Sequence, residues 1–417
     1  MKRTTLPIIL LLIIVSLVGV SNYRIKQAAL PLIEPLNVPK SASMQEKLVS
    51  IDQWLLKLSK DKKFNGAILV SKDNEPDLIK IYGYQDLQKE IPLTFQSSFR
   101  LGSVSKQFTA MAIMILQKQG RLEYDDPVQK YLPTFPYNDV SIRHLLTHTS
   151  GIADYMDLAL NEYFSLFTKI GFYLNQSMVN LLYNGEPSEY IDYYTVLTSN
   201  DVLRMVGKYS GKRLFFSEEK YLYSNTGYVI LSLIVENISG ITFEAFLDRE
   251  IFYPLNMKNS SFWNLFTEKG KLSNRVQGTN GQRLNDYSWM DGVSGDGSVF
   301  LSIEDFLMWD KAIKNNSLIS QSEFDEALNP FISSRADTTY YGFGWSLSED
   351  GHSIFHGGSW LGAVTYMYRK IDTNSMFVLL ESSTSKYSYE IRKEIQRVLN
   401  NTEPHMFIWK KILSKNY

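Results

Sequence analysis

Ser103 and Lys106 have the residue types and the spacing of an activated serine nucleophile. Residues three positions apart share one face of a helix, about 4.5 Å apart along its axis, so the amine can take the proton of the hydroxyl. A hydroxyl that gives its proton to a neighbouring base becomes a nucleophile. At a helix start, Ser103 would also lie near unpaired backbone N–H groups, which favour a developing negative charge.

The Ser-x-x-Lys spacing alone is weak evidence, because it occurs four times in this chain. Only Lys106 begins a long, largely apolar run, residues 108–116, which predicts a buried helix. Burial disfavours the ammonium form and favours the neutral amine that a base must be. The alternative is that Ser103 caps a helix while Lys106 reaches solvent. The other three copies lie in charged or polar stretches, where water would keep the lysine protonated. Their lysines are Lys62, Lys220 and Lys386.

Tyr223 and Asn225 form a second candidate group, which leads into an apolar helix over residues 228–235. A phenol beside a lysine can carry a second proton, and an asparagine amide can both donate to and accept from a substrate amide. Tyr173 and Asn175 repeat this spacing, but no helix start follows them. Taken alone, Tyr223 would be interpreted as a core tyrosine.

Residues 356–359, His-Gly-Gly-Ser, lie in an alternating apolar stretch that predicts strands at 353–355 and 363–368. Glycine weakens a strand interior unless another backbone or a ligand must approach closely. The two adjacent glycines therefore predict an edge that lines the substrate. The alternative is an ordinary bulge or hairpin turn.

In this order, Ser-x-x-Lys, Tyr-x-Asn and His-x-Gly resemble the motif series of the serine penicillin-recognising enzymes. The chain is similar to the group of class C beta-lactamases, D-alanyl-D-alanine carboxypeptidases and esterases over residues 44–399. Family landmarks also occur in residues 122–133, 143–152 and 251–257.

The resemblance implies a role for each motif residue. Ser103 would attack a carbonyl, Lys106 and Tyr223 would move the proton, and the backbone N–H groups of Ser103 and Ser359 would bind the oxyanion. Asn225 would help to hold the substrate.

His356 and Gly358 complete the implied substrate-binding set. His356 would line the opposite wall and polarise the substrate or the phenol of Tyr223. Family members use a Lys-Thr-Gly strand here to bind a substrate carboxylate, whereas this chain has histidine and glycine. A histidine is largely neutral at pH 7, so efficient hydrolysis of beta-lactams is not expected. A second departure, Ser217-Glu218 in place of Pro-Gly, is expected to reshape a turn only.

Three other patterns receive structural interpretations. His144 and His148 lack an acidic third ligand, so no metal site is predicted. Residues 357–362 are one residue too long for a Gly-x-Ser-x-Gly nucleophile elbow. Asp125 and Asp126 precede a proline and are expected to cap a helix.

Composition fits a globular enzyme: 417 residues, 44% hydrophobic, 21% charged and a formal net charge of -1. Without a basic block or a glycine-rich phosphate loop, neither nucleic acid nor a nucleotide cofactor is expected, and no other cofactor is implied. The absence of cysteine excludes disulfides and a thiol nucleophile.

Residues 1–21 are predicted to be a signal peptide or an uncleaved signal anchor, because basic residues precede the apolar stretch 6–20. We therefore expect an exported protein of the periplasm or cell envelope, possible anchoring in the inner membrane, and a monomer. Residues 22–43 are expected to be a linker, and 401–417 a tail. In that tail, residues 407–413 would pack on the domain or form a basic membrane-surface helix.

Periodicity predicts an α/β (α+β) catalytic domain over residues 44–400. Sheet parts at 44–102 and 294–400 would assemble one antiparallel sheet from the two ends, flanked by helices, with a mostly helical part, 103–293, inserted between them. This agrees with a beta-lactamase/transpeptidase-like fold, with the catalytic cleft where the two parts meet. Residues 153–212, rich in tyrosine and phenylalanine, are expected to form part of the cleft wall.

The predicted function is a serine hydrolase that works through an acyl-enzyme on a small peptide, amide or ester substrate. A D-amino-acid peptidase or carboxypeptidase is the first choice. The alternatives are a carboxylesterase or weak beta-lactamase, or a penicillin-binding sensor that does not turn over.

Overall fold

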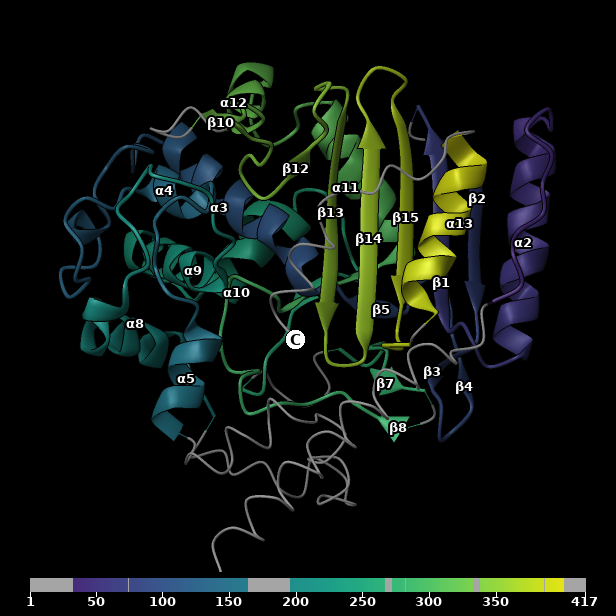
Figure 1. The fold of residues 1–417 in the computed structure, drawn as a ribbon, viewed down its shortest axis with the longest axis horizontal. Coiled ribbons are helices and arrows are strands. Elements are labelled where there is room, and N and C mark those ends of the chain that lie inside the picture. Colours follow the sequence, from purple (N-terminus) through teal and green to yellow (C-terminus); the bar gives the residue numbers. More distant parts are fainter. Residues whose placement is uncertain are drawn as a thin grey trace, which may run out of the picture.

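The computed structural model describes residues 33–73, 75–163, 196–266, 272–281, 283–332, 338–385 and 387–400. Within these ranges a sheet covered by helices lies beside a mostly helical lobe (Figure 1). The predicted signal segment, most of the aromatic-rich stretch, Tyr173 with Asn175, and the tail lie outside the described residues.

The main sheet has six strands in the order β12-β13-β14-β15-β1-β2. All of its pairs are antiparallel, and β1 from the N-terminal part pairs with β15 from the C-terminal part (Figure 1). The predicted sheet built from both ends of the chain is therefore confirmed. The strands are β1 Gly66–Lys72, β2 Glu75–Tyr82, β12 Ser346–Leu347, β13 Ser353–Trp360, β14 Ala363–Lys370 and β15 Ser375–Glu381.

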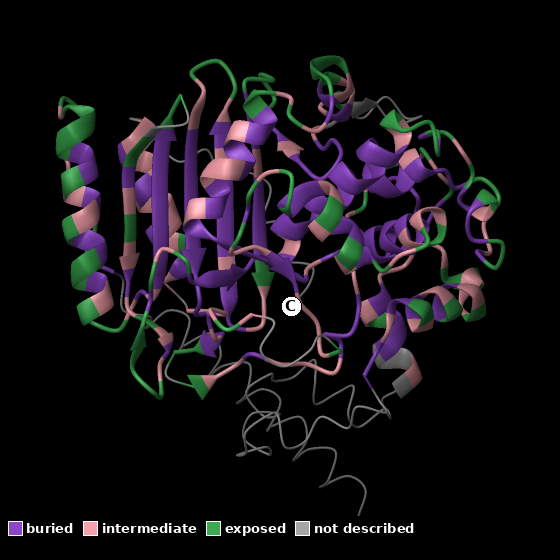
Figure 2. Cartoon of the chain, turned by 180° about the vertical axis from the view of Figure 1, so that it is seen from behind, coloured by how far each residue is buried: buried purple, intermediate pink, exposed green. Residues whose placement is uncertain are grey.

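Alternation along β1 gives the sheet two apolar faces. Ala67 and Leu69 join the core shared with α11, Ile303–Lys314. Ile68 and Val70 join a second core with α2, Met44–Lys60, and α13, Ser388–Asn400. A capping box begins α2: the Ser43 side chain accepts from Glu46 N, and the Glu46 side chain accepts from Ser43 N. Figure 2 shows the resulting buried inner face and exposed outer face of α2.

Residues 33–43, expected to be linker, also contribute to this second core. Ile33 and Leu36 are 5% and 3% exposed and lie among side chains of α2 and α13. The Leu36 N–H donates to Glu394 Oε2 at 3.1 Å. The prolines of this stretch therefore accompany an extended segment that packs against the domain.

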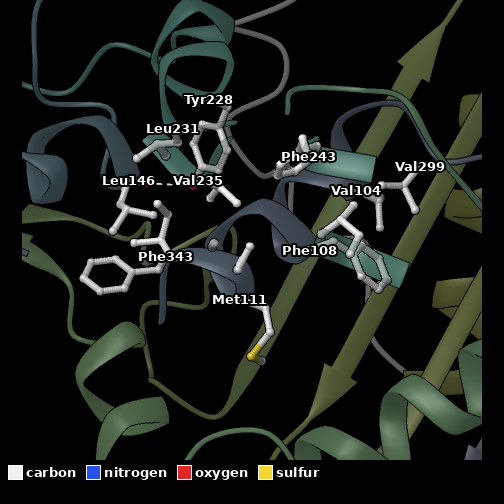
Figure 3. Packing of buried hydrophobic residues seen from close by; sticks show 14 of the residues in the cluster. Val104, Phe108, Met111, Leu146, Tyr228, Leu231, Val235, Phe243, Val299 and Phe343 are labelled. Atoms are coloured by element: carbon white, nitrogen blue, oxygen red, sulfur yellow. Dashed lines mark hydrogen bonds between the residues drawn. The ribbon is translucent and has the colours of Figure 1, made fainter. Parts of the chain in front are cut away.

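The helix that begins at Lys106 is the centre of the larger core. A 3-10 turn η1, Gly102–Ser105, leads into α3, Lys106–Lys118, and every residue of α3 from Lys106 to Leu116 is buried. Figure 3 shows Val104, Phe108 and Met111 among the side chains that pack around this segment. The predicted buried helix is confirmed, and the Ser103 side chain does not act as a helix cap.

The helical lobe surrounds α3 mainly with α9, Asn225–Ser239, α10, Phe243–Leu247, and η6, Asp248–Phe252. Within the described ranges, no single helix has the length and apolar composition of a membrane span; α9 and residues 243–252, bent by 76°, pass only as a pair. The remaining helical segments are η2 Val128–Lys130, α4 Ile142–Leu146, α5 Tyr155–Tyr163, α8 Ser199–Lys208, η5 Ser210–Lys212 and α12 Gln321–Ala327.

Short strands form small sheets that the sequence pattern did not predict. The largest has three strands, in the order β5-β9-β6, and its strand β5 holds the chain that leads into η1. Strands this short contain too few residues for a period of two to be recognised. They are β3 Tyr84–Asp86, β4 Ile91–Pro92, β5 Ser98–Arg100, β6 Ser261–Phe262, β7 Thr279–Asn280, β8 Arg283–Leu284, β9 Val299–Ser302, β10 Phe331–Ile332 and β11 Thr338–Thr339.

One alternative is excluded and two local predictions are corrected. β13 runs without a register shift through His356 to Ser359, so these residues form neither a bulge nor a hairpin turn. Residues 341–346 also carry a strand signal, but the strand observed there, β12, is limited to Ser346 and Leu347. The turn η2 has no side-chain cap, because Asp125 pairs with Arg143 and Asp126 accepts hydrogen bonds from residues around that turn.

Gly358 allows β13 to lie directly against the chain that leads into η1. A Cβ at Gly358 would lie 1.9 Å from the Leu101 carbonyl oxygen and 2.4 Å from Thr365 Oγ1. Thr365 Oγ1 also donates to that carbonyl at 2.6 Å. Of the two reasons expected for a glycine in this strand, the close approach of another backbone is therefore the one that applies to Gly358.

We expect Gly358→Ala to lower the free energy of unfolding by about 1–3 kcal/mol, because the added methyl group would force β13 away from Leu101. Thermal or urea unfolding measures the loss. Gly207→Ala is the matched control: this glycine lies within α8 with no atom near its Cβ position, so alanine is expected to be neutral or stabilising. Equal stability of the two variants would contradict the close packing at Gly358.

Candidate active site

The Lys106 amine is fully buried at the start of α3 and contacts three oxygen atoms. Its Nζ lies 2.8 Å from Asn225 Oδ1, 2.9 Å from the Asp296 carbonyl oxygen and 3.3 Å from Ser103 Oγ. The two motifs 119 positions apart in the sequence thus meet at one nitrogen atom.

The chemistry of these oxygens fixes how the amine is oriented. A carbonyl oxygen accepts hydrogen bonds and cannot donate, so Asn225 and Asp296 each require an N–H of Lys106. The Ser103 hydroxyl can donate or accept. When Lys106 is neutral it has two N–H groups and one lone pair, and with both N–H groups committed the lone pair faces the Ser103 hydroxyl. In this arrangement the Lys106 amine can act as a base that accepts the proton of the Ser103 hydroxyl.

Burial lowers the pKa of Lys106 to about 8, against the opposing effect of the carboxylates of Asp296 and Asp154, which raise it. The faces of two aromatic rings also lie near the ammonium position: Nζ is 4.9 Å from the ring centroid of Tyr223 and 5.5 Å from that of Tyr228. Aromatic faces stabilise a cation. The resulting pKa makes a substantial fraction of the amine neutral in mildly alkaline solution.

Asp154, which no sequence pattern singled out, orients the asparagine. Its Oδ2 accepts from the Asn225 backbone N at 2.9 Å and from Asn225 Nδ2 at 3.1 Å. Because a carboxylate accepts from N–H groups, the amide nitrogen of Asn225 must face Asp154, and its oxygen then faces Lys106. Burial raises the pKa of the Asp154 carboxyl, while the bond from the Asn225 backbone N–H opposes this shift.

Tyr223 lies beside Ser103, as the motif order implied. Burial raises the pKa of its phenol, and an interaction with the Ser103 hydroxyl partly offsets this. The phenol oxygen is buried and makes no hydrogen bond of good geometry to the described residues, so its contact with Ser103 is looser than that of Lys106. Tyr223 is therefore protonated at neutral pH and lies where it can exchange a proton with the serine.

His356 is the main correction to the predicted site. Its side chain is buried, and both ring nitrogens are used within the protein: Nδ1 lies 2.7 Å from the Gly357 carbonyl oxygen and Nε2 lies 3.0 Å from Tyr341 Oη. Since the carbonyl only accepts, Nδ1 carries the hydrogen and Nε2 accepts from Tyr341. The ring therefore accepts a hydrogen bond from Tyr341, and it has no free nitrogen with which to polarise a substrate.

Burial, and next the charge of Lys106, lower the pKa of His356 to about 3. It is neutral over the working range of an enzyme, which agrees with the absence of a fixed positive charge on this strand. Its partner Tyr341 was missed because it lies in an irregular segment, 15 residues before His356, with no recognisable motif around it.

Ser359 lies on the exposed part of β13, beside η1. β13 pairs with β14 along its whole length, but with β12 only at Ile354 and Phe355, so its other edge faces η1 at Ser359. A Cβ on Gly102, which has φ +53°, would lie 2.9 Å from the Ser359 nitrogen. The backbone nitrogen of Ser359 is thus close to the segment that carries the nucleophile.

His148 has the structural role that was expected of it. Its Nδ1 accepts from the Ser224 backbone N at 3.1 Å, and its ring lies 4.3 Å from that of Tyr223. His144 bonds instead to the Ser141 backbone N–H and to Glu218. Within the described ranges no group of three or more His, Cys, Asp or Glu side chains is arranged to hold a metal ion.

Comparison with known proteins identifies the family of this chain. A family model described as Beta-lactamase matches residues 51–399. The chain belongs to the beta-lactamase family. Penicillin-binding protein 4* of Bacillus subtilis is 31% identical over 360 residues, which cover 82% of this chain and 74% of that protein. The members of the family are mostly serine hydrolases.

Solved structures show that the beta-lactamase fold extends over most of the chain. A penicillin-binding protein from Bacillus halodurans has a TM-score of 0.65 at 23% identity, covering 83% of this chain and 98% of that one. A D-amino acid amidase from Ochrobactrum anthropi has a TM-score of 0.64 at 20% identity, covering 85% and 97%. At these identities the likeness concerns the fold.

We expect kcat/KM of this family member to rise with pH through a midpoint near 8. Lys106 must lose its proton before it can accept that of Ser103, and burial lowers its pKa to about 8. The pH profile of p-nitrophenyl ester hydrolysis, corrected for the rate without enzyme, measures this midpoint. A midpoint near the ordinary histidine value of about 6.5 would show that Lys106 is not the base.

We expect Asp154→Asn to lower kcat/KM about tenfold to a hundredfold, because Asn225 loses a charged hydrogen-bond partner. The midpoint of the pH profile should also move to lower pH, since the Asp154 carboxylate raises the pKa of Lys106. Asp77→Asn, an exposed position in β2, is the control and should change neither quantity. Loss of activity with an unmoved midpoint would leave Asp154 with a purely structural role.

Proposed function

We propose that the protein is a serine hydrolase that forms an acyl-enzyme with small amide, peptide or ester substrates. The observation that carries this proposal is the position of the Lys106 amine, whose only uncommitted direction points at Ser103 Oγ. Membership of a family of mostly serine hydrolases supports it.

In the proposed reaction Ser103 Oγ attacks the carbonyl carbon as its proton passes to Lys106 Nζ. The backbone N–H groups of Ser103 and Ser359 stabilise the oxyanion, and such donors are worth about 3–4 kcal/mol each. The bond to the leaving group then breaks, and the leaving amine or alcohol takes a proton delivered through Lys106 and Tyr223. Water, deprotonated by the same groups, attacks the ester and releases the acid and Ser103.

D-amino-acid amides and peptides are the first substrate class within this proposal. The described residues near Ser103 offer no fixed cation for a substrate carboxylate, because His356 is neutral and Arg100 is paired with Asp291. This favours an amidase or peptidase over a carboxypeptidase or beta-lactamase. The D-amino acid amidase of the same fold supports the choice, and a carboxylesterase is the second candidate.

The proposal includes export to the periplasm or cell envelope, with residues 1–21 as signal peptide or membrane anchor and the protein acting as a monomer. It rests on the sequence pattern of that segment. Fractionation of cells that produce the full chain, with sequencing of the mature N-terminus, tests it.

We expect Ser103→Ala to lower hydrolysis roughly a thousandfold or more and to abolish covalent labelling by a fluorescent penicillin, because both need the same oxygen nucleophile. The assays are a screen of D-aminoacyl amides, short p-nitrophenyl esters and cephalosporins, followed over time beside the label. Ser59→Ala is the matched control, since Ser59 and Lys62 repeat the spacing outside the site. Product formation by Ser103→Ala would remove Ser103 from the mechanism, and stable label without product would identify a sensor.

A further inference from the structure

A small cavity lies near the segments that carry Ser103 and Lys106. Its volume is about 20 Å³, which is room for a group the size of a water molecule or an ammonium. The Asp296 backbone on its wall accepts from Lys106 Nζ, and Trp360 directly follows Ser359. A methyl group added to Gly297 would lie 3.9 Å from the Gly102 carbonyl carbon. The lining residues are Tyr155, Met290, Asp291, Val293, Asp296, Gly297, Ser298 and Trp360.

The two carboxylates of this cavity differ in their partners. Asp291 Oδ1 accepts from Arg100 at 3.1 Å and from Trp360 Nε1 at 2.6 Å, while Oδ2 accepts from Ser288 N at 2.9 Å. Both side chains of the Arg100–Asp291 pair are buried, so this charge is neutralised. Asp291 therefore has little capacity for a further cation.

Among the described residues, Asp296 has no ion-pair partner of this kind. Its Oδ2 accepts from the neutral phenol of Tyr155 at 3.1 Å, and no cationic side chain within the described ranges forms an ion pair with it. Burial raises the pKa of Asp296 to about 6, with the charge of Lys106 opposing this shift, so the carboxylate is mainly ionised in mildly alkaline solution. It retains lone pairs for another donor.

The charge of the site changes when Lys106 acts as a base. With Lys106 neutral, the carboxylates of Asp296 and Asp154 lie near it, and neither forms an ion pair with a cationic side chain among the residues that the structure describes. An uncompensated buried charge is costly, whereas an incoming cation at hydrogen-bond distance makes a strong, charge-assisted contact. Tyr155 and Trp360 add aromatic surface, which favours an ammonium group over a hydrated metal ion.

We propose that this cavity binds the protonated amine of the substrate, on the carbon next to the scissile carbonyl, through the carboxylate of Asp296. This inference rests on the proposed function and narrows its substrates to acyl donors with a free amino group. N-acylated compounds carry a neutral amide in place of the ammonium group, so they would lose the ionic interaction with the Asp296 carboxylate. Met290 and Val293 form the apolar part of the cavity wall.

The test measures binding without turnover, in the Ser103→Ala background. Calorimetry compares D-alanine p-nitroanilide with its N-acetyl derivative. We expect the free amine to bind about tenfold to a hundredfold more tightly, the value of a charged hydrogen bond, and Asp296→Asn to bring the two affinities within a few-fold of each other. Asp248→Asn, a half-buried aspartate of η6 outside the site, is the matched control and should retain the preference.

Equal affinity of the two compounds for the Ser103→Ala chain would overturn the proposal, as would an unchanged preference after Asp296→Asn. Trp360→Leu is a second variant, which keeps the Asp296 carboxylate. It should weaken the binding of the free amine several-fold more than the binding of the N-acetyl compound. If Asp296→Asn does not fold, equal weakening of both compounds by Trp360→Leu overturns the proposal. Hydrolysis of a neutral p-nitrophenyl ester that depends on Ser103 tests the proposed function separately.

Discussion

The buried amine of Lys106 is the constraint on which the site depends. Two carbonyl oxygens, from Asn225 and from the Asp296 backbone, each require one of its hydrogens. The direction that remains faces Ser103 Oγ. Orientation and desolvation therefore act together: the acceptors aim the lone pair, and the apolar helix around the amine keeps its pKa low enough for that lone pair to be available.

Close backbone approaches hold this geometry. β13 lies against η1 because Gly358 has no Cβ, and Thr365 donates to the Leu101 carbonyl at the same point. On the other side, a Cβ at Gly344, where φ is +79°, would lie 2.7 Å from the Lys106 carbonyl oxygen. A helix held between backbone segments on two sides cannot shift without moving the sheet, so the positions of Ser103 and Lys106 follow from the packing of the whole domain.

The sequence was sufficient for the parts that local chemistry determines. The apolar run after Lys106 predicted a buried helix, alternation predicted the strands, and motif order implied that the motifs of Ser103 and Asn225 belong to one site. The contributions of Asp154, Tyr341 and the Asp296 backbone could not be predicted, because they come from irregular segments that only the folded chain brings to the site. His356 was misassigned for the same reason: its neighbours at both ring nitrogens depend on tertiary packing.

Electrostatics link the base to the choice of substrate. Asp154 and Asp296 raise the pKa of Lys106, so they oppose the neutral state that catalysis needs. Asp154 offsets this by fixing the Asn225 amide, whereas the Asp296 carboxylate accepts from the neutral phenol of Tyr155 and has no ion-pair partner among the described residues. A cation bound at Asp296 would cancel part of its field at Lys106 and favour loss of the lysine proton. A substrate amine at that position would thus activate the base, so that binding and proton transfer become coupled through one carboxylate.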